Sequence, residues 1–243
     1  MKLFQRIFFA AVLSGLAAGL VMSAVQQWRV APLILEAEVY ETAAAPAEHA
    51  HDSATPAVHE HDADAWAPQD GLERIGYTVL ANILASIGFA FLLAAVSVLS
   101  GIEITARNGV IWGLGGFVAL QLAPAFGLAP ELPGMPAADL VARQAWWVGT
   151  ALATGVGILA IARFRNWTGI ALAAVLILAP HLIGAPQLAG EHVSVVPAHL
   201  ASEFAAASLA TGALFWLIAG PLLGWLNERF TRAEVTALKG AHA

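Results

Sequence analysis

The stretch IGYTVLANILASIGFAFLLAAVSVLS, residues 75–100, carries no charged side chain along its whole length. About 20 apolar residues are enough for an α-helix to cross the hydrocarbon core of a bilayer. The only side-chain amide in the stretch is that of Asn82, and a single amide does not prevent a helix from spanning a membrane. This stretch therefore predicts a transmembrane helix.

The composition of the whole chain is that of a protein with several such helices. Of its 243 residues, 59% are hydrophobic and 12% are charged, whereas about 25% of the residues of a soluble domain are charged. The absence of cysteine excludes disulfides and thiolate metal sites. A net charge of −6 argues against nucleic-acid binding. Neither lysine, Lys2 or Lys239, lies in a glycine-rich phosphate loop, so no ATP-driven motor is expected.

The sequence predicts an all-α bundle of six membrane-spanning helices. The predicted spans are 7–25, 75–100, 109–128, 145–162, 168–183 and 204–226. The fifth span is the shortest and ends at Pro180 and His181, which leaves five spans as the alternative. The first span carries Gly15 and Gly19 at a spacing that suits close packing on another helix. It is longer than the apolar region of a cleaved signal peptide, so we expect it to be retained.

The distribution of basic residues predicts the orientation of the chain, because basic residues concentrate in cytoplasmic loops. With both termini cytoplasmic, that side holds eight of the eleven basic residues and the opposite side holds three. The eight are Lys2, Arg6, Arg107, Arg163, Arg165, Arg229, Arg232 and Lys239, and the three are Arg29, Arg74 and Arg143. The chain then consists of a first helix at 1–25, an extracytoplasmic loop at 26–74, and a helix bundle with a short cytoplasmic tail at 75–243. We expect it in the inner membrane, with the loop on the periplasmic side.

The loop contains the segment EHAHDSATPAVHEHDADAW, residues 48–66, which repeats the pattern His-x-His-Asp. The repeats consist of His49, His51 and Asp52, and of His59, His61 and Asp62. Neutral imidazole is a preferred ligand of Co²⁺, Ni²⁺ and Zn²⁺, and residues two apart point to the same side of an extended chain. The repeats therefore predict a loop that captures metal. The alternative is a disordered, solvated linker without a ligand.

A second group of candidate ligands lies at the predicted outer ends of the last two spans. His181 ends the fifth span, while His199 and Glu203 follow Pro197, a residue that suits the first turn of a helix. Their spacing of four residues places His199 and Glu203 on one helical face, as two ligands or as a ligand and the carboxylate that orients it. The alternative is that these residues only mark the boundary between membrane and water.

Two side-chain amides lie within the predicted spans, Asn82 in the second and Gln121 in the third. Polar groups in hydrocarbon often line a transport pathway. They also join neighbouring helices by hydrogen bonds, and the sequence leaves both interpretations open.

Several stretches of the chain together resemble one known family. They are MKLFQRIFFAAVLSGLAAGLVMSAVQQWRVAPLILEAEVYE at 1–41, QLAPAFGLAPELPGMPAADLVARQAWW at 121–147, and APHLIGAPQ at 179–187 followed by VPAHLASEFAAASLATGALFWLIAG at 196–220. They resemble CbtA, a family of proposed cobalt transporter subunits. The resemblance implies cobalt import without an ATPase in bacteria that make or use cobalamin, and a small, single-span, histidine-rich partner of the CbtB kind. It also points to Glu36 and Glu38 as candidate ligands, besides His181, His199 and Glu203.

The residues and the resemblance together predict a transporter in the lipid bilayer rather than an enzyme. We expect uptake of a divalent transition metal, above all Co²⁺, with Ni²⁺ and Zn²⁺ as alternatives; the ion is a substrate and no permanently bound cofactor is expected. The loop would capture it, and Glu36, Glu38, His181, His199 and Glu203 would receive it at the helix mouths. The alternative function is a subunit that only binds or senses metal for a partner transporter. The sequence has no HExxH signature, which argues against a zinc enzyme with Glu203 as general base. A homo-oligomer is compatible with the sequence.

Overall fold

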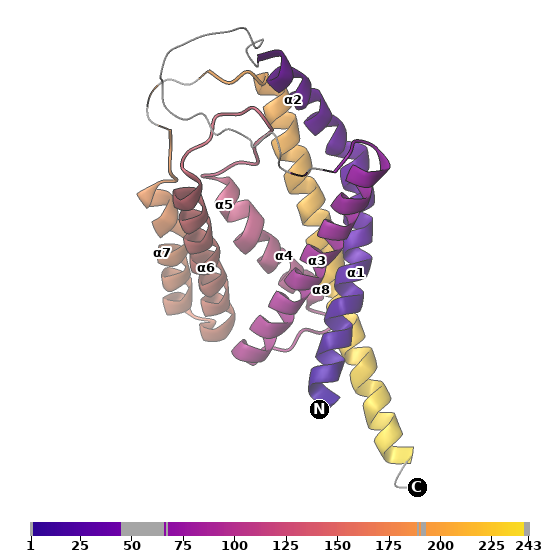
Figure 1. Cartoon of the computed structure of the whole chain (residues 1–243). Coiled ribbons are helices and arrows are strands. Elements are labelled where there is room, and N and C mark those ends of the chain that lie inside the picture. Colours follow the sequence, from indigo (N-terminus) through magenta and orange to yellow (C-terminus); the bar gives the residue numbers. More distant parts are fainter. Residues whose placement is uncertain (1, 45–65, 67, 189, 191–192, 241–243) are drawn as a thin grey trace.

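The computed structural model describes residues 2–44, 66, 68–188, 190 and 193–240, and all regular elements in these ranges are helices (Figure 1). In chain order they are α1 (Lys2–Arg29), α2 (Ala31–Ala44), α3 (Leu72–Ser100), α4 (Gly109–Phe117), the π-helix η1 (Val118–Leu122), α5 (Ala123–Ala125), α6 (Leu140–Phe164), α7 (Trp167–Ile183) and α8 (Ala198–Gly240). The predicted all-α architecture is confirmed.

Four helices are long and apolar enough to cross a membrane, namely α1, α3, α6 and α8. Two shorter apolar segments, Gly109–Ala125 and Trp167–Ile183, coincide with the third and fifth predicted spans. A helix of 17 residues such as α7 is about 25 Å long, slightly less than the hydrocarbon core. Both chain termini lie at the same end of the bundle, as Figure 1 shows.

Local capping fixes where several helices begin and end. The side chain of Asp139 accepts a hydrogen bond from the backbone N–H of Ala142 at 2.8 Å, at the start of α6. Asn166 accepts one from Gly169 at 2.9 Å and starts α7. Both residues satisfy a backbone donor that would otherwise lack a partner at a helix start. At the end of α3, Gly101 adopts φ 69°, which only glycine reaches without strain.

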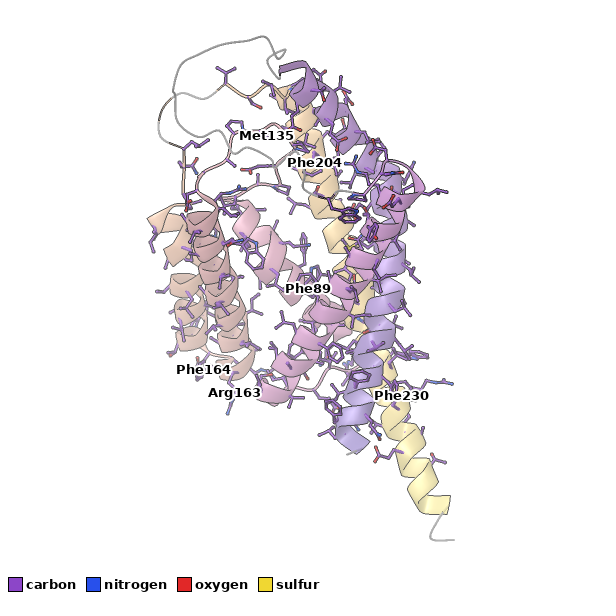
Figure 2. The ribbon with its side chains drawn as sticks, in the orientation of Figure 1. Phe89, Met135, Arg163, Phe164, Phe204 and Phe230 are labelled. Carbon is purple, nitrogen blue, oxygen red and sulfur yellow. The ribbon has the colours of Figure 1, made fainter. Side chains whose placement is uncertain are left out.

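The main core lies where α1, α3, α4 and α8 meet, around the buried side chains of Phe215 and Trp216. Phe89 of α3 packs against both rings (Figure 2). The small residues of α1 allow its backbone to touch α3, since a Cβ atom on Gly15 would lie 2.5 Å from the Cα atom of Ile87. The predicted close packing at Gly15 and Gly19 is confirmed, and both glycines face the turn around Ser86.

Helices α4 and α8 approach each other even more closely. A Cβ atom on Gly113 would lie 2.2 Å from the carbonyl oxygen of Trp216, and one on Gly220 would lie 2.2 Å from the carbonyl oxygen of Gly109. No side chain fits between these backbones. In a membrane, where apolar surface gains little from leaving lipid, such close contact between backbones is a main source of helix association.

The segment α4–η1–α5 connects this core to the α6–α7 pair. In Figure 1 the α6–α7 pair lies on one side of this segment, and α1, α3 and α8 lie on the other. The π-helix ends at Leu122, two residues before Pro124, whose ring in a regular α-helix would clash with the carbonyl four residues earlier, that of Leu120. The wider π-helix relieves this clash while the chain continues in the same direction. Helix α6 then packs on α7 through Gly157, where a Cβ atom would lie 3.4 Å from the Cα atom of Ala173.

A second, smaller core lies at the end of the bundle opposite the termini. There α2 packs against the first turns of α8, with Val30, Leu33 and Ala37 facing Leu200 and Phe204. Met135, from the connection between α5 and α6, covers this cluster next to Phe204 (Figure 2).

The first part of the predicted loop 26–74 is therefore helical, since α1 continues to Arg29 and α2 follows it. The apolar residues 30, 33 and 37 recur with helical spacing and need a partner surface, which α8 supplies. The middle of the loop, residues 45–65, lies outside the described residues.

The contact between α4 and α8 leads to a testable prediction. The substitution Gly113→Val should lower the free energy of unfolding by about 2 kcal/mol, because the added side chain has no space and the helices must separate. The matched control is Gly88→Val, since a Cβ atom there would meet nothing within 4 Å. Thermal unfolding of the two purified variants in detergent compares them, and equal melting temperatures would contradict the packing described above.

Candidate functional site

The end of the bundle opposite the termini carries the five predicted ligands that lie among the described residues. Glu36 and Glu38 lie on α2, His181 lies in the last turn of α7, and His199 and Glu203 lie in the first turns of α8. These elements reach the same end in Figure 1. Helix α8 begins at Ala198, directly after Pro197, so the predicted helical spacing of His199 and Glu203 is confirmed.

Glu38 is held by an arginine. Both oxygens of its carboxylate accept hydrogen bonds from the Arg74 guanidinium, one of them at 3.1 Å. Arg74 also contacts Asp70 at 3.1 Å. A guanidinium that donates in this two-pronged way fixes the start of α3 to α2. Because the Glu38 carboxylate is paired with Arg74, a metal ion would have to displace the guanidinium before it could coordinate Glu38.

Three of the four other predicted ligands at this end, Glu36, His199 and Glu203, are exposed to solvent. None of them takes part in an ion pair within the described ranges. They flank the small apolar core formed by α2 and α8, which sets the positions of their backbones. Their side chains remain accessible to an ion that arrives from solution.

His181 has a different environment, because aromatic rings surround it. The centroid of its ring lies 5.8 Å from that of Trp146 and 6.3 Å from that of Phe126, both in edge-to-face geometry. The indole N–H of Trp146 donates to the carbonyl oxygen of Pro180 at 3.1 Å, which ties α6 to the end of α7. His181 is thus half-buried and oriented by packing rather than by a carboxylate.

No group of three or more His, Asp or Glu side chains that could hold a metal ion is present among the described residues. The ligands predicted at the helix mouths therefore do not form one assembled site in this part of the chain, and their metal role stays a prediction. The loop residues His49, His51, Asp52, His59, His61 and Asp62 lie outside the described residues.

Asn82 joins two helices. Its amide group donates to Gln26 at 2.7 Å and to Ser23 at 3.2 Å, both on α1, while the Ser23 hydroxyl donates to the carbonyl of Gly19 at 2.8 Å. Of the two interpretations that the sequence left open for Asn82, the hydrogen bond between neighbouring helices is therefore the one that is observed. A role of Asn82 in lining a pathway stays a prediction.

Gln121 lies in the π-helix, and its amide oxygen is buried without a hydrogen-bond partner among the described residues. It faces α8, where a Cβ atom on Gly212 would lie 2.1 Å from this oxygen. The hydroxyl oxygens of Thr150 and Thr154 on α6 are likewise buried and have no hydrogen-bond partner among the described residues. Buried polar groups nearly always have partners. Seven buried side-chain atoms among the described residues lack one, and these three oxygens belong to that group. The sequence analysis did not identify either threonine, because two uncharged hydroxyl residues do not stand out within a long apolar helix.

The contact made by Asn82 can be tested with a double-mutant cycle. Asn82→Ala and Gln26→Ala should each destabilise the protein, with a coupling energy of about 0.6–1.7 kcal/mol, as measured for other hydrogen bonds between membrane helices. Chemical unfolding in detergent measures it. Additive losses would show that the bond does not join the helices. A loss of metal uptake much larger than the loss of folded protein would assign Asn82 to the pathway instead.

Comparison with protein families identifies a relationship along almost the whole chain. Residues 4–228 match the model of one family, described as "Probable cobalt transporter subunit (CbtA)". No curated protein and no solved structure matches the chain.

Proposed function

Because the chain belongs to the CbtA family of probable cobalt transporter subunits, we propose that it carries a divalent transition-metal ion inward across the inner membrane. Co²⁺ is the proposed substrate, and Ni²⁺ and Zn²⁺ share the ligand chemistry. The observation that carries this proposal is the family match over residues 4–228, which includes all or most of every helix. The protein acts as part of a transporter and not as an enzyme.

The proposed topology has six membrane crossings and both termini in the cytoplasm. Support comes from the two termini at one end of the bundle in Figure 1, since an odd number of crossings would separate them. The excess of basic residues near that end also supports this orientation. Helix α2 and the start of α8 then lie on the periplasmic side.

The histidine-rich loop is proposed to capture the ion, and the residues at the helix mouths to receive it. The described ends of the loop, at Ala44 of α2 and at the start of α3, flank the end of the bundle that carries Glu36, His199 and Glu203. An ion released by the His-x-His-Asp repeats would meet these exposed side chains first. His181, between Trp146 and Phe126, is the proposed next ligand.

Inside the bundle, the proposed path passes the buried oxygen atoms that lack partners among the described residues. The oxygens of Gln121, Thr150 and Thr154 are buried among apolar groups. A cation that moves past them would be stabilised by each oxygen that coordinates it. Such oxygens are costly in hydrocarbon, and a transport function accounts for their retention.

The family description as a subunit supports a partner protein. We propose that this partner is small, single-span and histidine-rich. The second candidate function is metal binding or sensing without transport, since the exposed ligands of α2 and α8 fit a binding surface equally well.

Uptake of radiolabelled cobalt by membrane vesicles tests the proposal, with this chain alone and with a candidate small partner protein. The double substitution His181→Ala and His199→Ala should lower saturable uptake about tenfold or more, because each imidazole lost removes a ligand. The control is His242→Ala, the same change in the C-terminal tail. Uptake equal to that of vesicles without the protein would exclude transport and leave the binding function.

The loop has a separate and milder role in this proposal. Replacement of His49, His51, His59 and His61 by alanine should raise the cobalt concentration for half-maximal uptake several-fold, because the loop concentrates the ion, and leave the maximal rate nearly unchanged. Ser53→Ala serves as the control within the loop. Loss of the maximal rate would place the repeats in the transport path itself.

A further inference from the structure

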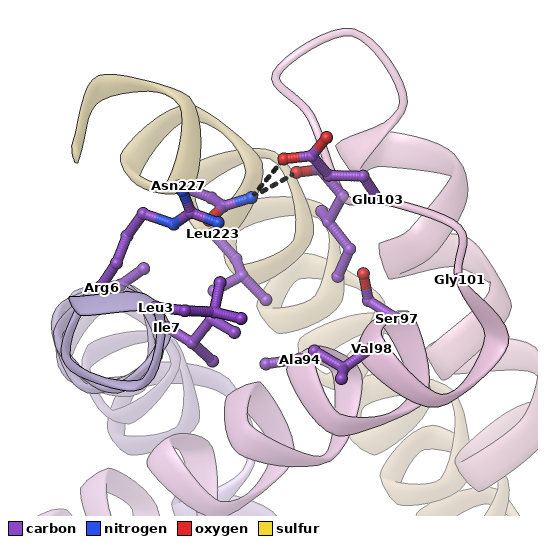
Figure 3. A pocket seen from close by; sticks show the side chains of 12 residues that line it. Leu3, Arg6, Ile7, Ala94, Ser97, Val98, Gly101, Glu103, Leu223 and Asn227 are labelled. Carbon is purple, nitrogen blue, oxygen red and sulfur yellow. Dashed lines mark hydrogen bonds between the residues drawn. The ribbon is translucent and has the colours of Figure 1, made fainter. Parts of the chain in front are cut away.

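A cavity of about 300 Å³ lies at the end of the bundle where both termini are found (Figures 1 and 3). It is a wedge between the first turns of α1, the last turns of α3 and the α8 turn that carries Asn227, and the α3–α4 connection closes one side. Three polar side chains on its wall, Arg6, Glu103 and Asn227, carry the argument. We call it the Arg6–Glu103 pocket.

The position of Glu103 in this pocket is fixed by a hydrogen-bonded loop. The Asn227 amide donates to the Glu103 carboxylate at 3.3 Å and to the Ile104 carbonyl at 3.2 Å. Asn108 donates to the Glu103 backbone carbonyl at 2.9 Å, and Glu228 accepts from the backbone N–H of Ala106 at 3.0 Å. Glu103 is therefore held at the pocket by contacts with α8 and with its own loop.

Two polar atoms of the pocket have unmet hydrogen-bonding capacity. The Nε atom of Arg6 and the Oδ1 atom of Asn227 are shielded from solvent and have no partner within the described ranges. The orientation of the Asn227 amide is determined by the two oxygens that its nitrogen contacts, so its oxygen cannot be exchanged with that nitrogen. Arg6 can therefore donate, and Asn227 can accept, one further hydrogen bond after a movement of the side chain that exposes the shielded atom.

The pocket also holds two opposite charges apart. Arg6 and Glu103 both line it, yet they form no ion pair with each other. An anionic group on the ligand would pair with the guanidinium, and a cationic group on the same ligand would pair with the carboxylate. Apart from Ser97, whose hydroxyl donates to the Ile102 carbonyl at 2.7 Å, the rest of the wall is apolar, and Leu3 and Val98 are 56% and 57% exposed at its rim.

The surroundings place the pocket at the level of lipid headgroups. Trp225, two residues before Asn227 on α8, is 45% exposed, and the guanidinium carbon of Arg229 lies 5.4 Å from the centre of its ring. Exposed tryptophans beside arginines are typical of the boundary between hydrocarbon and water.

We propose that the Arg6–Glu103 pocket binds a phospholipid with a primary ammonium headgroup, of the phosphatidylethanolamine class. The phosphate accepts from the Arg6 guanidinium, the ammonium group donates to the Glu103 carboxylate, and the glycerol and upper acyl chains lie on the apolar wall. A choline headgroup has no N–H to donate, and a glycerol headgroup has no positive charge. This site is independent of metal transport.

Native mass spectrometry of the purified full-length protein tests the proposal. The protein is mixed with equal amounts of phosphatidylethanolamine, phosphatidylcholine and phosphatidylglycerol that share the same acyl chains. We expect the first complex to carry phosphatidylethanolamine about tenfold more often than either other lipid, because a hydrogen bond between two charged groups contributes a factor of this size. Equal occupancy of the three lipids, or a preference for phosphatidylglycerol, would overturn the proposal.

Two variants assign the preference to the pocket. Glu103→Gln should remove the preference over phosphatidylcholine, because the ammonium group loses its charged partner. Arg6→Gln should weaken the binding of all three lipids, and Arg6→Lys should restore most of it. The controls are Glu73→Gln and Arg163→Gln, two exposed residues outside the pocket. A preference that survives Glu103→Gln in protein with an unchanged melting temperature would also overturn the proposal.

Discussion

The rest of the bundle depends on the contact between the backbones of α4 and α8. Around Gly109, Gly113 and Gly220 the two helices leave no room for a Cβ atom. The ring of Trp216 lies in the space that a side chain at Gly116 would need, so the same crossing also positions the largest buried side chain of the core. Because the α6–α7 pair reaches the core mainly through α4, η1 and α5, its position follows from this one contact.

This contact also explains the buried amide of the π-helix. Helix α8 presents Gly212 to Gln121 one turn before Trp216, so the amide enters the interface instead of facing lipid. The π-helix and Pro124 together interrupt the regular backbone hydrogen bonding at the same place. A polar side chain, an irregular backbone and a close helix crossing thus coincide in the centre of the third predicted span.

The sequence was sufficient to predict the long apolar helices and part of their packing, because both depend on local patterns, but it placed α2 in a loop. Long uncharged runs such as 75–100 require a spanning helix, the glycines at 15 and 19 require a neighbouring helix, and Pro197 sets the register of His199 and Glu203. The second core was not predictable, because the partner of α2 on α8 is more than 160 residues away in the chain. For the same reason the pairing of Glu38 with Arg74 and the Arg6–Glu103 pocket appear only in three dimensions.

The distribution of charge gives the two ends of the bundle different chemistry. Among the described residues at the end of α1, in α2, before and at the start of α3, in the α5–α6 connection and the first turn of α6, and at the start of α8, there are eight carboxylates and three guanidinium groups. The carboxylates are those of Glu36, Glu38, Glu41, Asp70, Glu73, Glu131, Asp139 and Glu203, and the guanidinium groups are those of Arg29, Arg74 and Arg143.

Arg74 forms an ion pair with Glu38, and Arg143 forms one with Glu131. The guanidinium carbon of Arg29 lies 5.5 Å from the centre of the Trp28 ring. Two of the three basic groups described at this end are thus paired with carboxylates, and a surplus of negative charge remains on exposed side chains such as Glu36 and Glu203. A surface with this potential raises the local concentration of cations before any ligand binds one. The ion pairs that join the outer helices use equal numbers of carboxylates and guanidinium groups, so they leave this surplus of negative charge unchanged.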